Sequence, residues 1–581
     1  MAILGVDVGG TFTDAVLLDG ERLATAKVPT ARRQEESVVA AALAVGAGDV
    51  ERFTHGTTMA TNALLERKGA RTAFVATAGF EHLLHLRRQN RARLYHPQAP
   101  QPEPLVPLER CFGVRERLGP DGVVAPLELS SLPELPADVE AVAVCLLFAF
   151  RDAAHERAVS ERIRERLPEA HVVASHEVAP EFREYERAST TAADAYLGPV
   201  LARYLRALAV ACAENGLPEP LVMRSSGGVA SLAEASEHAA IALVSGPAAG
   251  AVGASRLAAL AGIENAIAFD MGGTSTDVCT ILGGAVGRSH ERVVGNFPIR
   301  LPTVDIQTVG AGGGSIVWRD AGDALRVGPE SAGADPGPAC YGRGGTRPTV
   351  TDANLLLGRL PARLAGGIDL DRDAAERVLE GFDPAAVIEV VNGEMLRALR
   401  IVSVERGLDP RDFALVAFGG AGPLHACALA EELGMTAVLV PEAAGVLSAL
   451  GLAASDERRD RVRSYVRSLD EVGELPGEGE ADLRYRGQSF ELTVPLGPEL
   501  EGRFHAAHEE RYGYADRERD IELVAVRTAT IVPGPQLTLR AGAAYEAAGP
   551  DLVELPGATC WIPPGWRGRS NAQGTLVIER L

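Results

Sequence analysis

The sequence lacks the marks of several common protein classes. Its seven cysteines are scattered along 581 residues, and no two of them have the Cys-x-x-Cys spacing of a zinc or redox site. A disulfide framework or a zinc knuckle is therefore not expected. No uninterrupted apolar run is long enough to cross a membrane, and the first apolar run already carries Asp7, which a signal peptide would not. We therefore expect a cytoplasmic protein without a membrane-spanning segment.

Positive charge is scarce as well. The chain has 57 lysines and arginines, few of them lysines, against 78 aspartates and glutamates, which gives a formal net charge of −21. Nucleic acids and anionic membranes attract basic surfaces, so this balance argues against both as partners. The hydrophobic content of 46% supports large cores, and a chain of this length has room for roughly three or four domains.

One motif occurs twice in the chain. The segments Asp7–Asp14 and Asp270–Asp277 both read Asp-x-Gly-Gly-Thr-x-Thr-Asp, and each follows one short apolar run and precedes another. The runs are too short for helices and the glycines interrupt them, so we expect strand, tight turn and strand at both places. The repetition indicates a duplicated structural unit.

The chemistry of such a turn favours phosphate binding. Paired glycines expose consecutive backbone N–H groups, and they let an anion approach without a Cβ in the way. Asp7 and Asp270 end the first strand of each motif, where they can hold Mg²⁺ through its water molecules. Two ordinary hairpins are the alternative, which the repetition disfavours. The predicted cofactor residues here are Gly9, Gly10, Thr11, Thr13, Gly272, Gly273 and Thr274, and the predicted catalytic residues are Asp7, Asp270, Thr11 and Thr274.

This pattern resembles the sugar kinase, Hsp70 and actin superfamily. The resemblance implies an α/β fold in which two ribonuclease-H-like lobes, of the actin and sugar-kinase type, face each other across an ATP cleft. It also implies a third turn, with paired glycines before a helix, that contacts adenosine. The apolar run Phe413–Ala417 is followed by Gly419, Gly420 and Gly422 and then by a helical stretch over Leu424–Leu433. All three parts therefore occur in the expected order.

A polar loop is a candidate for the substrate side of the cleft. Residues His55–Asn62 crowd hydroxyl and amide side chains just before an expected helix, where His55, Thr57 and Thr58 could orient a polar or anionic ligand. Capping of that helix by Thr58 or Thr61 is the alternative.

A basic stretch over 79–91 is a second candidate. Arg88 and Arg91 are predicted to hold a substrate carboxylate or phosphate, with surface ion pairs as the alternative. His82 and His85 would share one helical face, but two histidines without a third ligand are more typical of a surface than of a metal site. The glycine-rich loops 310–315 and 333–342 are predicted to line the cleft, with Gly312 and Gly313 beside the cofactor.

The remaining patterns divide the chain into three parts. Helices are expected over 34–45, 152–167 and 184–212 and from Ser245, where Gly250 and Gly253 would allow close packing on a neighbour. After about residue 465, strand patterns at 481–494 and 521–532 flank a helix at 504–512, and a hairpin around Gln573 ends the chain. We predict an N-terminal lobe over 1–190, a second lobe over 191–464 and a small C-terminal α+β module over 465–581.

Further segments narrow the resemblance. The two motifs, together with 55–62, 88–91, 310–315, 333–341, 347–354, 405–411 and 419–425, resemble the hydantoinase A/5-oxoprolinase family along almost the whole chain. That family includes ATP-dependent hydantoin and lactam hydrolases and the ATP-handling subunits of acetone and acetophenone carboxylases.

The resemblance implies an enzyme that uses ATP and Mg²⁺ to open a cyclic amide such as a hydantoin or 5-oxoproline. Amide resonance makes the carbonyl carbon a poor electrophile, and phosphorylation of the carbonyl oxygen creates a leaving group. Phosphoryl transfer needs chiefly positioning and charge neutralisation. A hydantoinase B-type partner subunit and an oligomer are also implied. Two alternatives stay open: the ATP-using subunit of a ketone carboxylase and, more weakly, a non-enzymatic nucleotide switch like actin.

Overall fold

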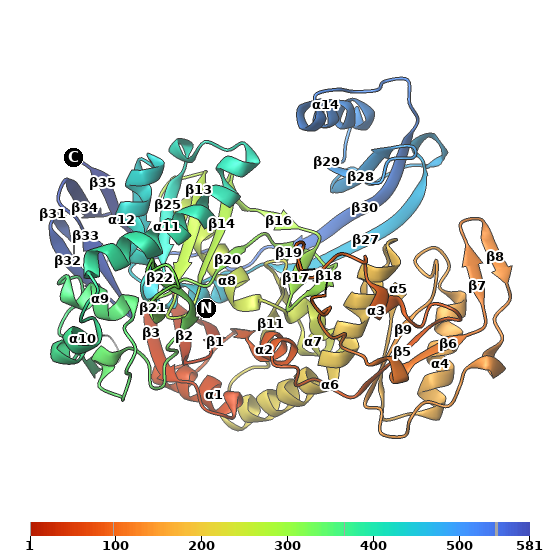
Figure 1. Cartoon of the computed structure of the whole chain (residues 1–581), viewed down its shortest axis with the longest axis horizontal. Helices are drawn as coiled ribbons and strands as arrows, with labels where there is room; N and C mark the ends of the chain where they lie inside the picture. Colours follow the sequence, from red (N-terminus) through yellow and green to blue (C-terminus); the bar gives the residue numbers. More distant parts are fainter. Residues whose placement is uncertain (1, 97, 365–366, 541–543) are drawn as a thin grey trace.

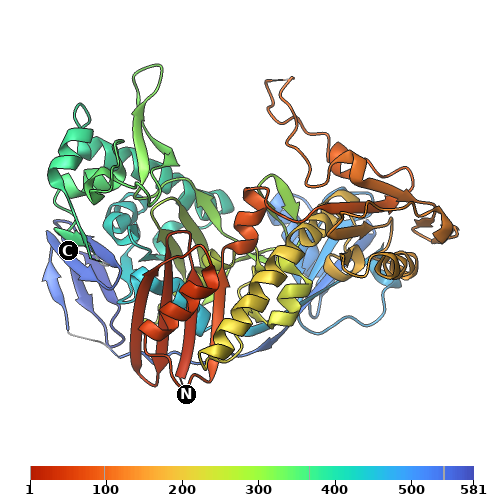
Figure 2. The same cartoon turned by 90° about the horizontal axis from the view of Figure 1, so that it is seen from below.

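Two large β-sheets form the frame of the molecule (Figure 1, Figure 2). The structure is a computed structural model, and it describes residues 2–96, 98–364, 367–540 and 544–581. The strand order is β29-β28-β30-β27-β12-β11-β4-β1-β2-β3 in the first sheet, where β12 is Val229–Ala230, and β15-β14-β13-β25-β26-β35-β34-β31 in the second. Within the described residues, no helix is both long enough and apolar enough to cross a membrane.

The centres of the two sheets repeat one topology. Each has an antiparallel hairpin whose first strand lies parallel to two later strands on its other side. In the first sheet these strands are β1 (Ala2–Val8), β2 (Phe12–Asp19), β3 (Arg22–Pro29), β4 (Arg52–Thr57) and β11 (Leu221–Met223). Their counterparts are β13 (Ala266–Met271), β14 (Thr276–Leu282), β15 (Ala285–Val286), β25 (Ala414–Phe418) and β26 (Ala437–Val440). The predicted pair of ribonuclease-H-like lobes is confirmed.

Helices of the two lobes meet between the sheets. The helix α8 (Ser245–Leu260) packs on α13 (Leu447–Ala453) so closely that a Cβ on Gly451 would collide with the backbone of Ala249. Gly253 lies equally close to Leu447, so the predicted close packing of this helix is confirmed. Buried residues of both lobes consequently form one continuous core.

The other predicted helices also form. They are α1 (Gln34–Ala44), α4 (Ala154–Arg166) and the long α6 (Glu184–Glu214). The helices near the ends of the hairpin strands are α2 (Met59–Leu65), α9 (Val350–Leu356), α11 (Pro384–Val402) and α12 (Gly422–Leu433).

A four-stranded sheet lies at the end of the molecule opposite the C-terminus (Figure 1). Its order is β10-β9-β5-β6, and the strands are β5 (Thr72–Thr77), β6 (Cys111–Val114), β9 (Ala141–Cys145) and β10 (His171–Ala174). The sheet packs between α6 and α4, which is why β9 is buried along its whole length.

The chain after residue 464 divides between the two large sheets. The strands β27 (Glu457–Ser468), β28 (Glu480–Tyr485), β29 (Leu492–Pro495) and β30 (Ile521–Val532) extend the first sheet beside α14 (Leu500–Tyr512), whereas β31 (Glu546–Ala548), β34 (Trp566–Ser570) and β35 (Leu576–Arg580) extend the second. The predicted C-terminal hairpin is confirmed.

The single strand expected over 481–494 is instead the antiparallel pair β28 and β29, because the chain reverses between them. The domain boundaries at 190 and 464 stay predictions.

Candidate active site

The two Gly-Gly-Thr turns have the same geometry. In each turn the N–H of the first glycine donates to the carbonyl three residues on, from Gly9 to Phe12 at 2.9 Å and from Gly272 to Ser275 at 3.0 Å. Among the described residues, no heavy atom beyond the chain neighbours lies within 4 Å of the place where a Cβ would stand on the second glycine of either turn. The backbone of both turns is therefore open to an anion.

The threonines of the two motifs are also placed alike. Thr11 and Thr274 are exposed at the turns, where their hydroxyl groups can meet a ligand. Thr13 is buried, and its hydroxyl shares a 3.1 Å hydrogen bond with Thr30. The buried hydroxyl of Thr276 donates to the carbonyl of Ala311 at 2.6 Å. Thr13, predicted to bind the cofactor, therefore supports the turn from inside.

The two first aspartates approach each other between the lobes. Burial raises the pKa of Asp7 to about 7 and that of Asp270 to about 8, and the strand partners Asp14 and Asp277 add to the increase. Asp7 itself contributes to the raised pKa of Asp270, so the two carboxyl groups are near enough to interact. Oδ1 of Asp7 is buried and has no hydrogen-bond partner among the described residues.

Lysine 27 supplies positive charge to this group of carboxylates. Lys27 extends from β3 to Asp14, with 2.5 Å between Nζ and Oδ1, and its side chain is 23% exposed. Its charge lowers the pKa of both Asp7 and Asp270 against the effect of burial. Sequence reasoning missed this residue, although one signal was available: the chain has only two lysines, Lys27 and Lys68.

Glycine-rich segments surround the second turn. The N–H groups of Gly313 and Gly314 donate to the carbonyls of Gly272 and Gly273 at 3.0 and 2.7 Å. A Cβ on Gly312 would lie 2.6 Å from the backbone nitrogen of Thr274. The structure thus places the predicted loop over 310–315 directly on the second turn.

The predicted adenosine turn lies beside the same hairpin. Ala421, inside the turn Gly419–Gly422, donates its N–H to the carbonyl of Met271 at 2.9 Å. Gly419 lies so close to Asp270 that a Cβ there would collide with the carboxylate. In the first lobe Gly56 approaches an aspartate in a similar way, because a Cβ there would collide with the carboxylate of Asp7.

The end of β4 places Gly56 beside Asp7 and Thr57 beside Val8, and Thr58 follows directly. Gly56 faces Asp7 in the parallel register, and Ser245 donates its hydroxyl to the carbonyl of Thr57 at 3.0 Å. Oγ1 of Thr58 is buried and has no hydrogen-bond partner among the described residues. The hydroxyl of Thr58 makes no cap hydrogen bond to α2, and that of Thr61 accepts from the N–H of Val244 at 2.9 Å, so the alternative in which Thr58 or Thr61 caps this helix is wrong. The hydroxyl of Thr57 instead accepts from the N–H of Met59, the first residue of α2, at 3.1 Å.

His55 lies in the core instead of at a ligand surface. Its side chain is fully buried, with Nδ1 3.2 Å from the carbonyl of Val6 and Nε2 2.8 Å from the hydroxyl of Tyr204. Burial lowers the pKa of His55 to about 4, against the effect of the Val6 carbonyl. The ring is neutral, both of its nitrogens are hydrogen-bonded, and it holds β4 in place. This buried position does not support the predicted contact between His55 and a substrate.

The basic stretch 79–91 lies elsewhere. Figure 1 shows α3 (Leu83–Leu86), which precedes Arg88 and Arg91, beside α6 and the four-stranded sheet. Arg88 forms a two-pronged ion pair with Glu186 of α6, and Arg91 donates to the carbonyl of Leu94 at 3.3 Å. The ion-pair alternative therefore accounts for Arg88. His82 and His85 belong to no group of metal-ligating side chains among the described residues.

Comparison with known proteins agrees with this arrangement. The hydantoinase/oxoprolinase family model matches residues 187–461, and the model of the family's N-terminal region matches residues 3–167. The caprolactamase subunit alpha of Pseudomonas jessenii is 33% identical over 99% of this chain and 98% of its own length. The crystal structure of the ATP-dependent caprolactamase from that organism superposes with a TM-score of 0.86 at 31% identity, covering 99% of each chain.

Two other relatives are named for different reactions. The acetophenone carboxylase gamma subunit of Aromatoleum aromaticum is 35% identical over 84% of this chain and 72% of its own length. The 5-oxoprolinase 1 of Arabidopsis thaliana is 31% identical over 90% of this chain but only 49% of its own length. Matches of this extent show the family. The chain belongs to the hydantoinase/oxoprolinase family.

Proposed function

We propose that this chain is the ATP-binding subunit of an enzyme that opens a cyclic amide by phosphorylating its carbonyl oxygen. The observation that carries the proposal is the convergence of Asp7, Asp270 and Lys27 between two open turns of equal geometry. The relatives support the reaction class, because they include a caprolactamase and a 5-oxoprolinase.

The turns provide the groups that a nucleotide triphosphate needs. The phosphates would lie against the exposed N–H groups of Gly10 and Gly273 and the hydroxyls of Thr11 and Thr274. The adenosine would lie at the Gly419–Gly422 turn, which is bonded to the end of β13 at Met271. ATP supplies the phosphoryl group that converts the carbonyl oxygen of the substrate into a leaving group.

The carboxylates fit a hydrated Mg²⁺. Oδ1 of Asp7 is buried and finds no hydrogen-bond partner in the described part of the chain, and burial raises the pKa of Asp7 and Asp270. A divalent cation between them would stabilise their ionised forms. Among the described residues no three or more His, Cys, Asp or Glu side chains form a direct metal cage, and Mg²⁺ characteristically keeps several of its waters. Asp7 and Asp270 would therefore hold the ion through water.

The remaining roles belong to Lys27 and to the threonines after β4. Lys27, held by Asp14, would donate to an oxygen of the transferred phosphoryl group and offset the charge that develops there. The unpartnered hydroxyl of Thr58, with the backbone of Thr57, would orient the acceptor carbonyl beside Asp7. Both groups act by positioning, which is the main requirement of phosphoryl transfer.

A second subunit is part of the proposal. One relative is named as subunit alpha, another as a gamma subunit, and the chain matches 49% of the 5-oxoprolinase. A hydantoinase B-type partner would then supply the hydrolytic step. The 35% identity to the acetophenone carboxylase subunit favours a ketone carboxylase as the second candidate function.

A phosphate-release screen distinguishes the cyclic-amide hydrolase from the ketone carboxylase. The chain, with and without the co-purifying partner, would be mixed with ATP and Mg²⁺ and then with a hydantoin, 5-oxoproline or a lactam. In parallel, acetone or acetophenone would be supplied with bicarbonate. Release that depends on the cyclic amide supports the proposal, and release that depends on ketone plus bicarbonate selects the carboxylase. Basal release that no substrate changes would contradict both.

A further inference from the structure

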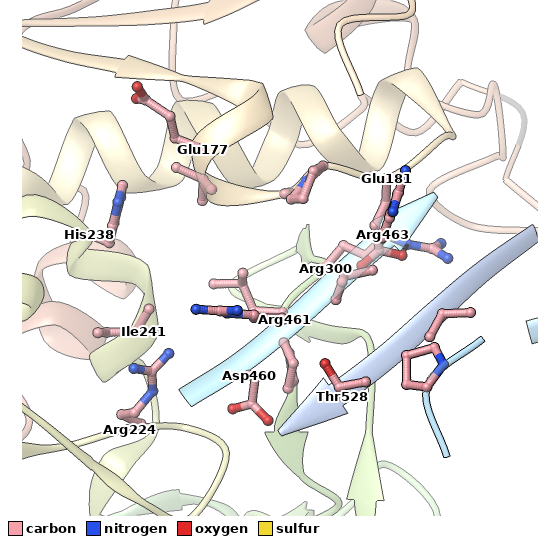
Figure 3. A pocket seen from close by; sticks show the side chains of 18 of the residues that line it. Glu177, Glu181, Arg224, His238, Ile241, Arg300, Asp460, Arg461, Arg463 and Thr528 are labelled. Atoms are coloured by element: carbon pink, nitrogen blue, oxygen red, sulfur yellow. Dashed lines mark hydrogen bonds and ion pairs between the residues drawn. The ribbon is translucent and has the colours of Figure 1, made fainter. Parts of the chain in front are cut away.

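A cavity of about 820 Å³ lies away from the two turns, beside the long ribbon of β27 and β30 (Figure 3). Its other walls are α5 (Ser175–Val178) with the loop to Glu181, the short helix Ala239–Ala242, and the loop Arg300–Pro302. Several stretches that are distant in the sequence therefore meet around one space. The volume is in the range of small-molecule sites.

The cavity combines apolar walls with arginines and with carboxylates, most of which pair with an arginine. Val178, Ile241, Leu301, Val462 and Val526 supply the apolar surface. The arginines at the cavity are of two kinds, those neutralised by carboxylates and those that are not. Arg224 pairs with Glu234 at 2.6 Å, and Arg300 pairs with Glu181 at 2.7 Å. Arg461 and Arg463 have no carboxylate partner among the described residues.

Among the arginines of the cavity, Arg461 is the one available to bind a ligand. It extends from β27 into the cavity, toward the side formed by His238 and Ile241 (Figure 3). Arg463, by contrast, stacks on the ring of Tyr465 at 5.0 Å from its centroid. In a chain with a net charge of −21, an unpaired guanidinium that faces a partly apolar cavity is suited to a carboxylate, which it can bind through two parallel hydrogen bonds.

One short segment connects this cavity to Asp7. Ile241 lines the cavity, and its carbonyl accepts hydrogen bonds from the N–H and the hydroxyl of Ser225. Five residues later, a Cβ on Gly246 would lie 3.6 Å from both carboxylate oxygens of Asp7. Between them Val244, a β-branched residue, has φ +58°, a left-handed conformation that is strained for such a residue and tends to mark functional segments. A ligand in the cavity would therefore touch the segment that contacts the phosphate site.

We propose that this cavity binds a small molecule that carries a carboxylate on a short apolar body, and that Arg461 receives the carboxylate. This proposal rests on the proposed function in one respect only, namely the reaction from which the ligand comes. Opening a cyclic amide creates a carboxylate in every product, and an acidic cyclic amide carries one before the ring opens. The shared chemistry is the carboxylate, and the experiment distinguishes the two sources.

The test is calorimetric binding to the full chain without nucleotide. The ligands are 5-oxoproline, its ring-opened form glutamate, and 2-pyrrolidinone, which is 5-oxoproline without the carboxylate. We expect saturable binding of at least one acid and none of 2-pyrrolidinone over the same range. Tighter binding of 5-oxoproline would mark a substrate site, and tighter binding of glutamate would mark a product site. Equal binding of 2-pyrrolidinone, or binding of neither acid, would overturn the proposal.

Variants on one strand provide the control. Arg461→Gln should weaken acid binding roughly tenfold or more, the loss expected when a hydrogen bond to a charged group is removed. Arg459→Gln makes the same charge change on β27, outside the cavity walls, and should leave affinity unchanged. Equal effects of the two variants would overturn the assignment. Because ATP is absent, failure here is distinguishable from failure of the phosphorylation reaction, which the phosphate-release screen measures.

Discussion

The two hairpins share their motif, strand register and turn hydrogen bond, yet their surroundings differ. The carbonyls of Gly272 and Gly273 accept from the N–H groups of Gly313 and Gly314, which belong to a loop far along the chain. The first turn is bonded instead by Thr30, whose hydroxyl donates to the carbonyl of Gly9 at 3.0 Å and whose N–H donates to the carbonyl of Thr11 at 2.9 Å. Duplication supplied the same backbone geometry twice, and the later loops made the two turns unequal.

Their charges differ as well. Asp14 of the first hairpin is paired with Lys27, whose ammonium also acts on Asp7 and Asp270. Burial raises the pKa of Asp277 in the second hairpin, against the Thr308 hydroxyl and the charge of Arg292. The cation that reaches both inner carboxylates therefore comes from the first lobe. A symmetric pair of turns can bind phosphate, but the ammonium of Lys27 acts from the first lobe only and makes the site asymmetric.

The largest expected effect tests whether the inner aspartates are equivalent. Asp7→Asn and Asp270→Asn should each lower ATP turnover by about 10³-fold, because each removes charge that organises the phosphates. The fold should persist, since an amide is easier to bury than a carboxylate. Steady-state phosphate release and thermal unfolding measure the two properties. Asp323→Asn, at an 83% exposed side chain, is the control. Substantial turnover in either variant would show that the two hairpins have different roles.

The next prediction tests whether Lys27 makes the two halves of the site unequal. Lys27→Met should lower turnover by about 10²-fold while ATP still binds, since the two turns and their N–H groups stay intact. Lys68→Met, at a 75% exposed lysine paired with Glu66, should change neither property. Unchanged turnover in Lys27→Met would remove the lysine from the site.

Chemical labelling gives an independent check on Lys27. The chain offers an amine reagent only two lysines and the N-terminus. ATP with Mg²⁺ should slow the labelling of Lys27 and leave the rate at Lys68 unchanged. Mass spectrometry of the labelled peptides measures both rates, and equal protection of the two lysines would contradict direct contact with the nucleotide.

The sequence pattern alone predicted the hairpins because their signals are local. Short apolar runs, paired glycines and exact repetition are all visible in the chain. Lys27 was missed because its role depends on β3 pairing with β2, which places it opposite Asp14. His55 was misassigned because a residue in a parallel strand buried on both faces looks, in sequence, like part of the polar loop that follows it.

Long-range pairing explains the other differences. Arg88 meets a carboxylate 98 residues away, at Glu186. The strands after residue 464 pair with both large sheets, and no local pattern states which sheet a strand will join. The cavity beside Arg461 is assembled from stretches that are distant in the sequence, so the periodicity of the sequence gives no sign of it.

A smaller effect concerns the acceptor side of the first hairpin. Thr58→Val should lower substrate-stimulated turnover by about tenfold, the value of one lost hydrogen bond, while ATP affinity stays the same. Thr436→Val, at an exposed threonine before the amino end of β26, is the matched control. Equal loss of ATP binding would place Thr58 at the nucleotide, and no loss at all would remove it from the acceptor site.

The last effect is on stability and compares the two lobes through one buried histidine in each. Burial lowers the pKa of His55 to about 4, and burial with the nearby Arg359 lowers that of His425 to about 3. An unfolded histidine titrates near pH 6.5, so below that pH the unfolded state binds the proton first. The free energy of unfolding should then fall as pH decreases, by up to about 1.4 kcal/mol per pH unit for each histidine, down to the folded pKa.

Urea unfolding between pH 7 and pH 4 measures this slope. His55→Gln and His425→Gln should each reduce it by about one proton. His96→Gln, at an exposed histidine, is the control and should leave it unchanged. His55 is held by Val6 and Tyr204, and His425 by Asn392 at 2.8 Å. Equal slopes for the two variants would show that both lobes bury a neutral histidine to the same degree. A slope unaffected by His55→Gln would mean that its ring protonates in the folded state, which would reopen a ligand role for His55.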